Sequence, residues 1–229
     1  MRAQVVLTPA ESKKLISKAV LQMEPVKKAL RDGLLVVHPS TSTYFILEEL
    51  LGESPGGVQV VGIVVPRGTC LSGRALDATT YRVPGKTGAQ YSANHWTFRQ
   101  GKPERGAYLI DTLAEMKPGD VYIKGANALD TEGKAGVLLA QRDGGTIGRT
   151  IGASRRNGFQ IIVPIGLDKV IPVPIRVAAA AAGARRTDRA MGVPVSVMRV
   201  PGTVVTEVDA FQMLSGAQAT PLAAGGLNE

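Results

Sequence analysis

The chain has 229 residues, of which 44% are hydrophobic and 20% charged, a composition typical of a globular protein with a substantial core. Its net charge is +8, and residues 142–199 alone carry ten Lys or Arg against three Asp, which favours an anionic ligand or, alternatively, a solvated basic face. A single cysteine excludes an internal disulfide framework, and the sequence has no long uncharged apolar run, so we expect a cytoplasmic protein. It has no CxxC or HExxH motif, and we expect no metal or cofactor.

The N-terminal third shows clear helix and strand signals. Thr8-Pro9-Ala10-Glu11 combines a capping box with a proline at the first helical position, and predicts a helix to about Met23. A second helix is expected to end at Asp32-Gly33, followed by an apolar strand over Leu34 to Val37. A further helix is expected from Tyr44 to Leu51, ended by Gly52.

Four consecutive hydroxyl side chains lie between that strand and that helix. They are Ser40, Thr41, Ser42 and Thr43. Hydroxyl groups and the first free N–H groups of a helix can together hold a phosphate, so this loop is a candidate ligand site. Helix capping is the alternative, because one Ser or Thr is expected there in any case.

The region that follows is harder to interpret. Val58 to Val65 reads as a buried strand, and residues 66–117 as a glycine-bearing irregular segment that forms a lid or a subunit contact. Cys70 stands just past the strand end, where it could be a nucleophile or simply a small buried apolar residue. The aromatic residues between Tyr91 and Phe98, next to His95, favour a homo-oligomer.

The central segment, Pro118 to Gly148, carries the strongest functional pattern. An apolar strand over Val121 to Ile123 leads into a loop that holds four candidate ligand or catalytic positions. They are Lys124, Gly125, Asn127 and Asp130. A second loop, Gly144-Gly145-Thr146, precedes a helix whose N–H groups can bind an anion. Two polar glycine loops around one apolar segment therefore predict a ligand site.

The remaining elements continue an alternation of helices and strands. We expect a helix to Arg156 and strands at Phe159 to Pro164 and Val193 to Val200. Val170 to Val177, with two prolines, reads as a strand that lies at an edge or is irregular, and Ala178 to Ala190 as a helix or loop. A last helix covers Glu207 to Leu214, while the role of residues 205–226 stays unassigned. This order predicts one α/β domain over residues 1–229, a Rossmann-like three-layer fold with a mainly parallel sheet and helices on both faces.

The order of motifs resembles the ribose-5-phosphate isomerase and coenzyme A transferase-like superfamily, which includes the regulatory subunits of translation initiation factor 2B. LLVVHPSTSTYF, residues 34–45, is similar to the strand and phosphate loop of the isomerases, with Ser42-Thr43 at the end of the loop. Lys124-Gly125-Ala126-Asn127 stands in the place of the family's Asp-Gly-Ala-Asp motif, and residues 144–148 and 159–169 match later landmarks loosely. Because Lys124 and Asn127 replace the family aspartates, the resemblance implies the fold but not the isomerase chemistry.

Two functional hypotheses follow. The first is an enzyme that isomerises or otherwise converts a phosphorylated or anionic metabolite, sugar-phosphate or CoA-like, with Asp130 as general base and Lys124 or Lys134 neutralising negative charge. The second is a non-catalytic sensor or regulatory subunit that kept the pocket, in which Asp130 caps a turn with Thr131 and Gly133. Nucleic-acid binding is a weaker third hypothesis, because aromatic residues make up only 4% of the chain.

Overall fold

The computed structural model describes residues 2–55, 62–65, 68–71, 95–105, 107–140, 144–183 and 185–223, with backbone alone for residues 62–65 and 68–71. These ranges form an α/β structure around a mixed six-stranded sheet, in the order β11-β9-β6-β1-β4-β5. The predicted strand Val58–Val61, the side chain of Cys70, residues 72–94 with Tyr91, and the last residues of the chain lie outside this description.

Four neighbouring strands of the large sheet are parallel. β1 pairs with β6, β6 with β9, and β9 with β11, all in parallel, whereas β4 and β5 continue the sheet in antiparallel orientation. Their bounds are β1 Leu34–Val37, β4 Trp96–Arg99, β5 Lys102–Glu104, β6 Val121–Ile123, β9 Gln160–Pro164 and β11 Thr203–Val205. The prediction of an α/β protein with a mostly parallel sheet is confirmed.

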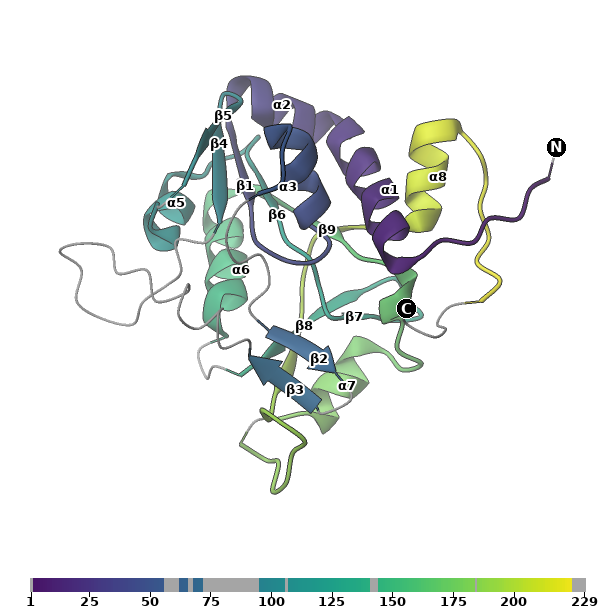
Figure 1. Cartoon of the computed structure of the whole chain (residues 1–229). Coiled ribbons are helices and arrows are strands. Elements are labelled where there is room, and N and C mark those ends of the chain that lie inside the picture. Colours follow the sequence, from purple (N-terminus) through teal and green to yellow (C-terminus); the bar gives the residue numbers. More distant parts are fainter. Residues whose placement is uncertain are drawn as a thin grey trace.

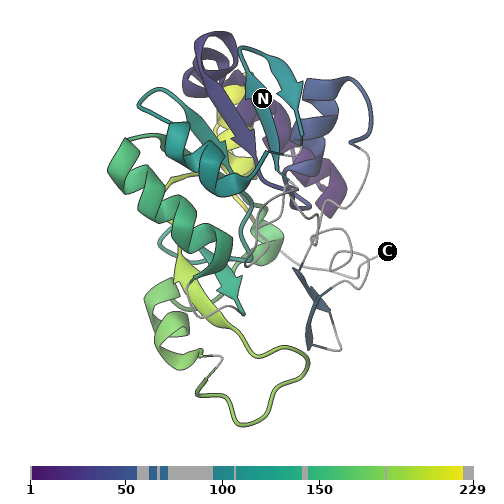
Figure 2. The same ribbon diagram turned by 90° about the vertical axis from the view of Figure 1, so that its left-hand side faces the viewer.

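Both faces of this sheet are buried, and a different set of helices lies on each face. Alternate strand residues point to opposite sides, so Leu35 and Ile162 join one hydrophobic cluster while Val36 and Ile161 join the other. Figures 1 and 2 show α1, α2 and α3 on one side of the sheet and α5 and α6 on the other. The helices are α1 Pro9–Gln22, α2 Glu24–Asp32, α3 Tyr44–Leu51, α5 Leu109–Glu115, α6 Gly145–Asn157, α7 Ile175–Ala181 and α8 Glu207–Ser215.

Local signals placed the first helices accurately. Thr8 and Glu11 form the expected capping box at the start of α1, and Gly52 ends α3 in the left-handed conformation. The strand Leu34–Val37 also has its predicted bounds, because its four residues are fully buried between the two clusters. A second capping box, Thr206 with Asp209, begins α8.

Two smaller sheets were not anticipated. Gly62–Val65 (β2) pairs antiparallel with Gly68–Leu71 (β3), so the strand that was predicted to end at Val65 lies outside the mainly parallel sheet. Only two residues separate these strands, and a parallel pair needs a much longer crossover. Ala128–Leu129 (β7), Ala135–Leu139 (β8) and Ser196–Arg199 (β10) form a three-stranded antiparallel sheet.

The proline-rich stretch after β9 is also different from the prediction. Val170 to Val177 does not form an edge strand: a single-turn helix (η1, Leu167–Lys169) is followed by a bridge from Val170 to Leu129, and α7 begins at Ile175. Pro172 and Pro174 lack the N–H groups that a strand would donate, while Pro174 suits the position before a helix.

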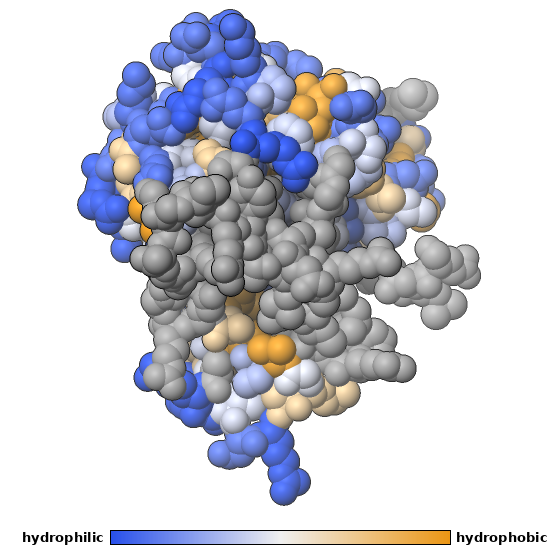
Figure 3. Space-filling model, turned by 60° about the vertical axis from the view of Figure 1, so that its left-hand side comes forward, coloured by the Kyte–Doolittle hydropathy of each residue, from blue (hydrophilic) through white to orange (hydrophobic). Residues whose placement is uncertain are grey.

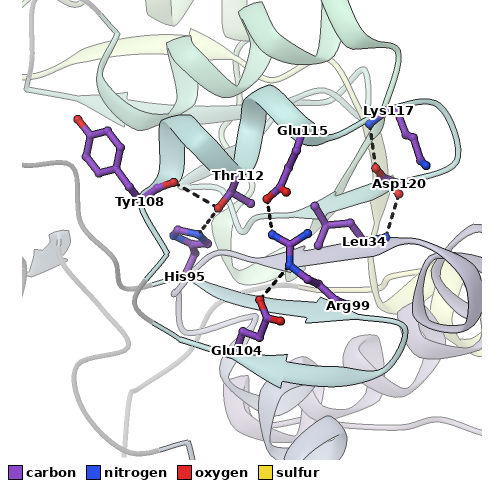
Figure 4. Close-up of polar contacts among 9 residues, drawn as sticks. All are labelled: Leu34, His95, Arg99, Glu104, Tyr108, Thr112, Glu115, Lys117 and Asp120. Carbon is purple, nitrogen blue, oxygen red and sulfur yellow. Dashed lines mark hydrogen bonds and ion pairs between the residues drawn. The ribbon is translucent and has the colours of Figure 1, made fainter. Parts of the chain in front are cut away.

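The amino ends of the parallel strands are tied by a buried carboxylate. Asp120, 2% exposed, accepts hydrogen bonds from the backbone N–H groups of Leu34 at 2.9 Å and Lys117 at 2.8 Å (Figure 4). Nearby, Arg99 of β4 bridges Glu104 and Glu115, and the hydrogen bond that its guanidinium donates to Glu115 contributes most to raising the pKa of the arginine. These contacts fix β1, β4 and β6 at the edge opposite to their polar loops.

Some aromatic residues that suggested a subunit contact belong to the core. Phe98 is 1% exposed, and Trp96 stacks with it at a centroid distance of 6.4 Å while Arg105 lies over the Trp96 ring. His95 is buried and contacts Thr112 of α5 at 3.2 Å (Figure 4). Their apolar surface is therefore used inside the molecule, and these two rings do not support self-association.

The surface of one face is unevenly polar. Figure 3 shows mostly hydrophilic residues over the upper part of the described surface, with some hydrophobic residues among them, and both kinds in the lower part. Within the described ranges, no helix is both long and apolar enough to cross a membrane.

Candidate functional site

Three loops meet where the parallel strands end. They are residues 38–43 after β1, residues 124–127 after β6 and residues 165–169 after β9, and we call them the carboxyl-end loops. The Lys169 ammonium donates to the carbonyl oxygen of Ala126 at 2.8 Å, which joins the second loop to the third. A Cβ atom built on Gly125 would lie 2.5 Å from the Ser40 Oγ, so the first and second loops are in close contact. Parallel strands therefore bring these polar segments to one edge, where open α/β sheets bind ligands.

The hydroxyl-rich loop contains one buried hydroxyl without a partner. Ser40 and Thr43 satisfy each other and the local backbone: their hydroxyls lie 2.9 Å apart, and Thr43 donates to the carbonyl oxygen of His38 at 2.6 Å. Thr41 is exposed. Ser42 is fully buried, and among the described residues its Oγ has no hydrogen-bond partner. Two of the four hydroxyls thus bond within the loop, although no side chain caps the helix that starts at Tyr44, and Ser42 is the one left for a ligand.

Lys124 is a half-buried cation at the end of β6. Within the described part of the chain, its ammonium forms no hydrogen bond or ion pair that would offset its desolvation. Burial, followed by the charge of Lys169, lowers the pKa of Lys124 to about 8. Burial also lowers the pKa of Lys169, although the neighbouring Asp168 opposes that shift. Two lysines that repel one another in a poorly hydrated position form a site where a bound anion would be stabilised.

A histidine close to Lys124 is paired with a tyrosine. The His38 Nδ1 and the Tyr122 hydroxyl share a hydrogen bond of 2.9 Å, and both residues are buried. Burial, then the charges of Lys124 and His95, lowers the pKa of His38 well below its usual value, so the imidazole is neutral. Burial raises the pKa of Tyr122, so the phenol stays protonated. The pair is therefore uncharged and adds no negative charge that could neutralise Lys124.

Asp130 is engaged by backbone groups. Its Oδ1 accepts from the N–H groups of Glu132 at 2.9 Å and Lys134 at 2.8 Å, and its Oδ2 accepts from the first residue of α7, Ile175, at 2.8 Å. Desolvation alone raises the pKa of this carboxyl, but the backbone hydrogen bonds from Ile175, Lys134 and Glu132 outweigh it, and the pKa lies below its usual value. This geometry is the turn-capping arrangement, and a low pKa makes a carboxylate a weak base.

Two other predicted positions serve the small antiparallel sheet. Asn127 is exposed, and its Oδ1 accepts from the N–H of Leu138 at 3.0 Å. The Lys134 ammonium forms an ion pair with Glu132 in the turn between β7 and β8. Both residues therefore have structural partners in the small antiparallel sheet and its turn, although Asn127 is also the last residue of the second carboxyl-end loop.

The glycine loop before α6 lies next to a separate cavity. Gly144, in the left-handed conformation, is the residue just before α6, and the Thr146 carbonyl accepts a hydrogen bond from the Thr150 hydroxyl. The cavity is about 520 Å³ in volume, and its lining residues include Gly144, Ala179, Arg185, Arg186 and Met198. Gly144 thus contributes to this cavity, while the Ser42, Gly125 and Lys124 positions meet at the carboxyl-end loops.

Three residues of the site were missed as ligand positions: His38, Tyr122 and Lys169. His38 and Lys169 follow apolar strands, so their position at strand ends was an available signal. Tyr122 lies inside a strand, and only its hydrogen bond with His38 shows that it belongs to the candidate site. In comparisons with known proteins, no protein-family model, curated protein or solved structure matches this chain.

Proposed function

We propose that this chain binds a small anionic ligand, a phosphorylated or carboxylated metabolite, at the carboxyl-end loops. The observation that carries the proposal is the approach of Lys169 to the half-buried Lys124, whose pKa falls to about 8. Two repelling cations with reduced hydration raise the free energy of the empty site. An anion between them offsets both costs, because opposite charge nearby favours the ammonium form of each lysine.

The Ser42 hydroxyl supports the same proposal. It is buried and has no partner among the described residues, which costs free energy comparable to a lost hydrogen bond. A phosphate or carboxylate oxygen that reached Ser42 would satisfy it. Gly125 supports this too, because a side chain at its position would meet the Ser40 hydroxyl.

The proposed fold type is a Rossmann-like three-layer arrangement, in which ligands bind at the carboxyl ends of parallel strands. The resemblance to ribose-5-phosphate isomerases and coenzyme A transferases supports a sugar-phosphate or CoA-like ligand. Asp130, the remaining acidic candidate for a base, is held by three backbone N–H groups. We therefore favour binding or sensing over isomerisation through Asp130, and keep the isomerase-like enzyme as the second candidate.

Calorimetric titration with ribose 5-phosphate, coenzyme A and inorganic phosphate tests the proposal, with uncharged ribose as the control ligand. We expect at least one anion to bind, and Lys124→Ala to weaken it by about tenfold or more, roughly 1.4 kcal/mol. The affinity of the variant should also depend less on salt, because one charge has been removed from the site. Lys28→Ala, which removes an exposed lysine of α2, is the charge-matched control and should bind as the unmodified chain does.

Two outcomes would contradict the proposal: no binding of any of the three anions, or equal affinity of the Lys124→Ala and Lys28→Ala variants. Turnover distinguishes the two candidate functions. If the chain isomerises ribose 5-phosphate and Asp130→Asn abolishes this while binding persists, the enzyme candidate is correct.

A further inference from the structure

We propose that Lys124 is a nucleophilic amine that forms a reversible imine with an aldehyde or ketone group of an anionic substrate. This inference rests on the proposed anion site and assigns it a covalent chemistry. Lys124 follows directly after β6, so a short strand in the core of the sheet fixes the start of its side chain. The residue as a whole is half-buried, and it lies in the second of the carboxyl-end loops, close to the loop that carries Ser42.

The surroundings of Lys124 favour a free amine over a paired ammonium. The charged group that acts most on it is Lys169 of η1, which is held 2.8 Å from the Ala126 carbonyl by its own hydrogen bond. The group facing it from the end of β1 is His38, which is neutral, and the Tyr122 phenol behind His38 is protonated. Asp168 acts on Lys169 and is exposed, and Lys13 of α1 adds a further positive charge there.

These surroundings have a direct chemical consequence. With a pKa of about 8, about a tenth of the Lys124 amine is neutral at pH 7, on the order of a hundredfold more than for an ordinary lysine. A neutral amine has the lone pair that attacks a carbonyl carbon, and desolvation beside a second cation is an established way to activate a lysine.

The covalent step is balanced without any further reactant. The Lys124 nitrogen attacks the carbonyl carbon and gives a carbinolamine, after one proton passes from nitrogen to the former carbonyl oxygen. The C–O bond then breaks, the oxygen leaves as water with the second amine proton, and a C=N bond remains. Hydrolysis reverses both steps and restores the amine.

Lys169 gives this chemistry its substrate class. Its ammonium uses one proton on the Ala126 carbonyl and lies near Lys124, so a phosphate or carboxylate held there places an attached carbonyl group beside the amine. The buried Ser42 hydroxyl is a second donor for the same anion. The substrate would therefore be a small carbonyl compound that carries a phosphate or a carboxylate.

The test uses a matched pair of aldehydes, glycolaldehyde phosphate and uncharged glycolaldehyde, with the full chain and sodium cyanoborohydride. Intact mass spectrometry counts the adducts, and peptide mapping locates them. We expect one main adduct, on Lys124, formed about tenfold faster or more with the phosphorylated aldehyde, because binding raises the local concentration. The labelling rate should rise with pH and level off above about 8, where Lys124 becomes neutral.

Variants separate the imine from general lysine reactivity. Lys124→Arg keeps the charge and should lose the main adduct, while Lys28→Arg should keep it. Lys169→Ala should slow labelling by the phosphorylated aldehyde and shift the pH midpoint upward, because the repulsion that lowers the pKa of Lys124 is removed.

Adducts spread evenly over exposed lysines, or a Lys124→Arg variant that keeps the main adduct, would overturn the imine proposal. If glycolaldehyde phosphate binds in calorimetry but leaves no adduct on Lys124, the imine is wrong and the anion site remains. If neither binding nor an adduct is found, both proposals fail.

Discussion

At the scale of single residues, buried polar groups with specific partners define this structure. Asp130 and Asp120 are nearly inaccessible carboxylates, and each is satisfied by backbone N–H groups from segments far apart in the sequence. Lys124 and the Ser42 hydroxyl are polar groups without such partners among the described residues. This contrast separates structural polar residues from those available to a ligand.

Asp130→Asn tests the structural role of Asp130. The folded-state pKa of this carboxyl is depressed, so its stabilisation is fully present above the unfolded-state pKa and is lost as the pH falls through the folded-state pKa. We expect the variant to lose about 1–3 kcal/mol of unfolding free energy at pH 7. Urea unfolding should show that the difference between the two proteins narrows as the pH falls below about 4. A difference that is constant with pH would rule out this role.

Gly125→Ala tests the close approach of two carboxyl-end loops. The added methyl group would lie 2.5 Å from the Ser40 Oγ and 3.1 Å from its Cβ, so the loops must move apart. We expect a loss of anion affinity of about tenfold, roughly 1.4 kcal/mol, in the calorimetric titration. Gly152→Ala, in α6, meets only the flexible end of Arg156 and serves as the control. Unchanged anion affinity in Gly125→Ala would show that this approach does not shape the site.

At the scale of elements, the helices α1 and α8 hold the loop that carries Lys169. Glu207, the first residue of α8, accepts a hydrogen bond from the Ser12 hydroxyl of α1. It also accepts one from the backbone N–H of Leu167, whose nitrogen lies 3.0 Å from the Glu207 Oε2. Gly166 passes so close that a Cβ there would lie 3.1 Å from the Glu207 Oε1. The position of Lys169 therefore depends on two helices at opposite ends of the chain.

Glu207→Gln tests this dependence. The amide keeps the shape of the side chain but is uncharged and has one acceptor oxygen instead of two. The Leu167 N–H therefore loses one of its two acceptors, and the hydrogen bonds that remain are weaker than those to a carboxylate. We expect anion affinity to fall by several-fold while the far-ultraviolet circular dichroism spectrum stays unchanged. Asp188→Asn, in an exposed loop, is the charge-matched control. Equal anion affinity in the two variants would remove Glu207 from the positioning of the loop.

At the scale of the whole molecule, the parallel part of the sheet gives the chain two chemically different edges. The amino-end edge is closed by Asp120 and the Arg99 ion pairs (Figure 4), whereas the carboxyl-end edge gathers lysines and hydroxyls. The overall charge of +8 adds a long-range attraction for anions that salt weakens. A ligand site at one edge thus follows from strand direction.

Self-association stays a prediction at this scale. The rings of Trp96 and Phe98 pack in the core, but other apolar side chains are exposed, among them Val177 at 41% and Met191 at 71%. We expect sedimentation velocity at micromolar concentration to give a mass above the 24.0 kDa of one chain. A single monomeric species would contradict the prediction.

The sequence by itself determined the elements that local chemistry specifies. Caps, prolines and glycines act within a few residues, so α1, α3 and the strand Leu34–Val37 could be predicted with their bounds. It also placed Lys124 and the hydroxyl loop at strand ends, because apolar runs that stop at polar residues mark such ends.

Only the tertiary structure decided which polar residues meet. Lys169 lies 45 residues after Lys124, and Ile175 lies 45 residues after Asp130, so neither the lysine pair nor the capping of Asp130 leaves a local signal. The pairing of strands across such distances depends on the burial of the whole sheet, which no short segment encodes.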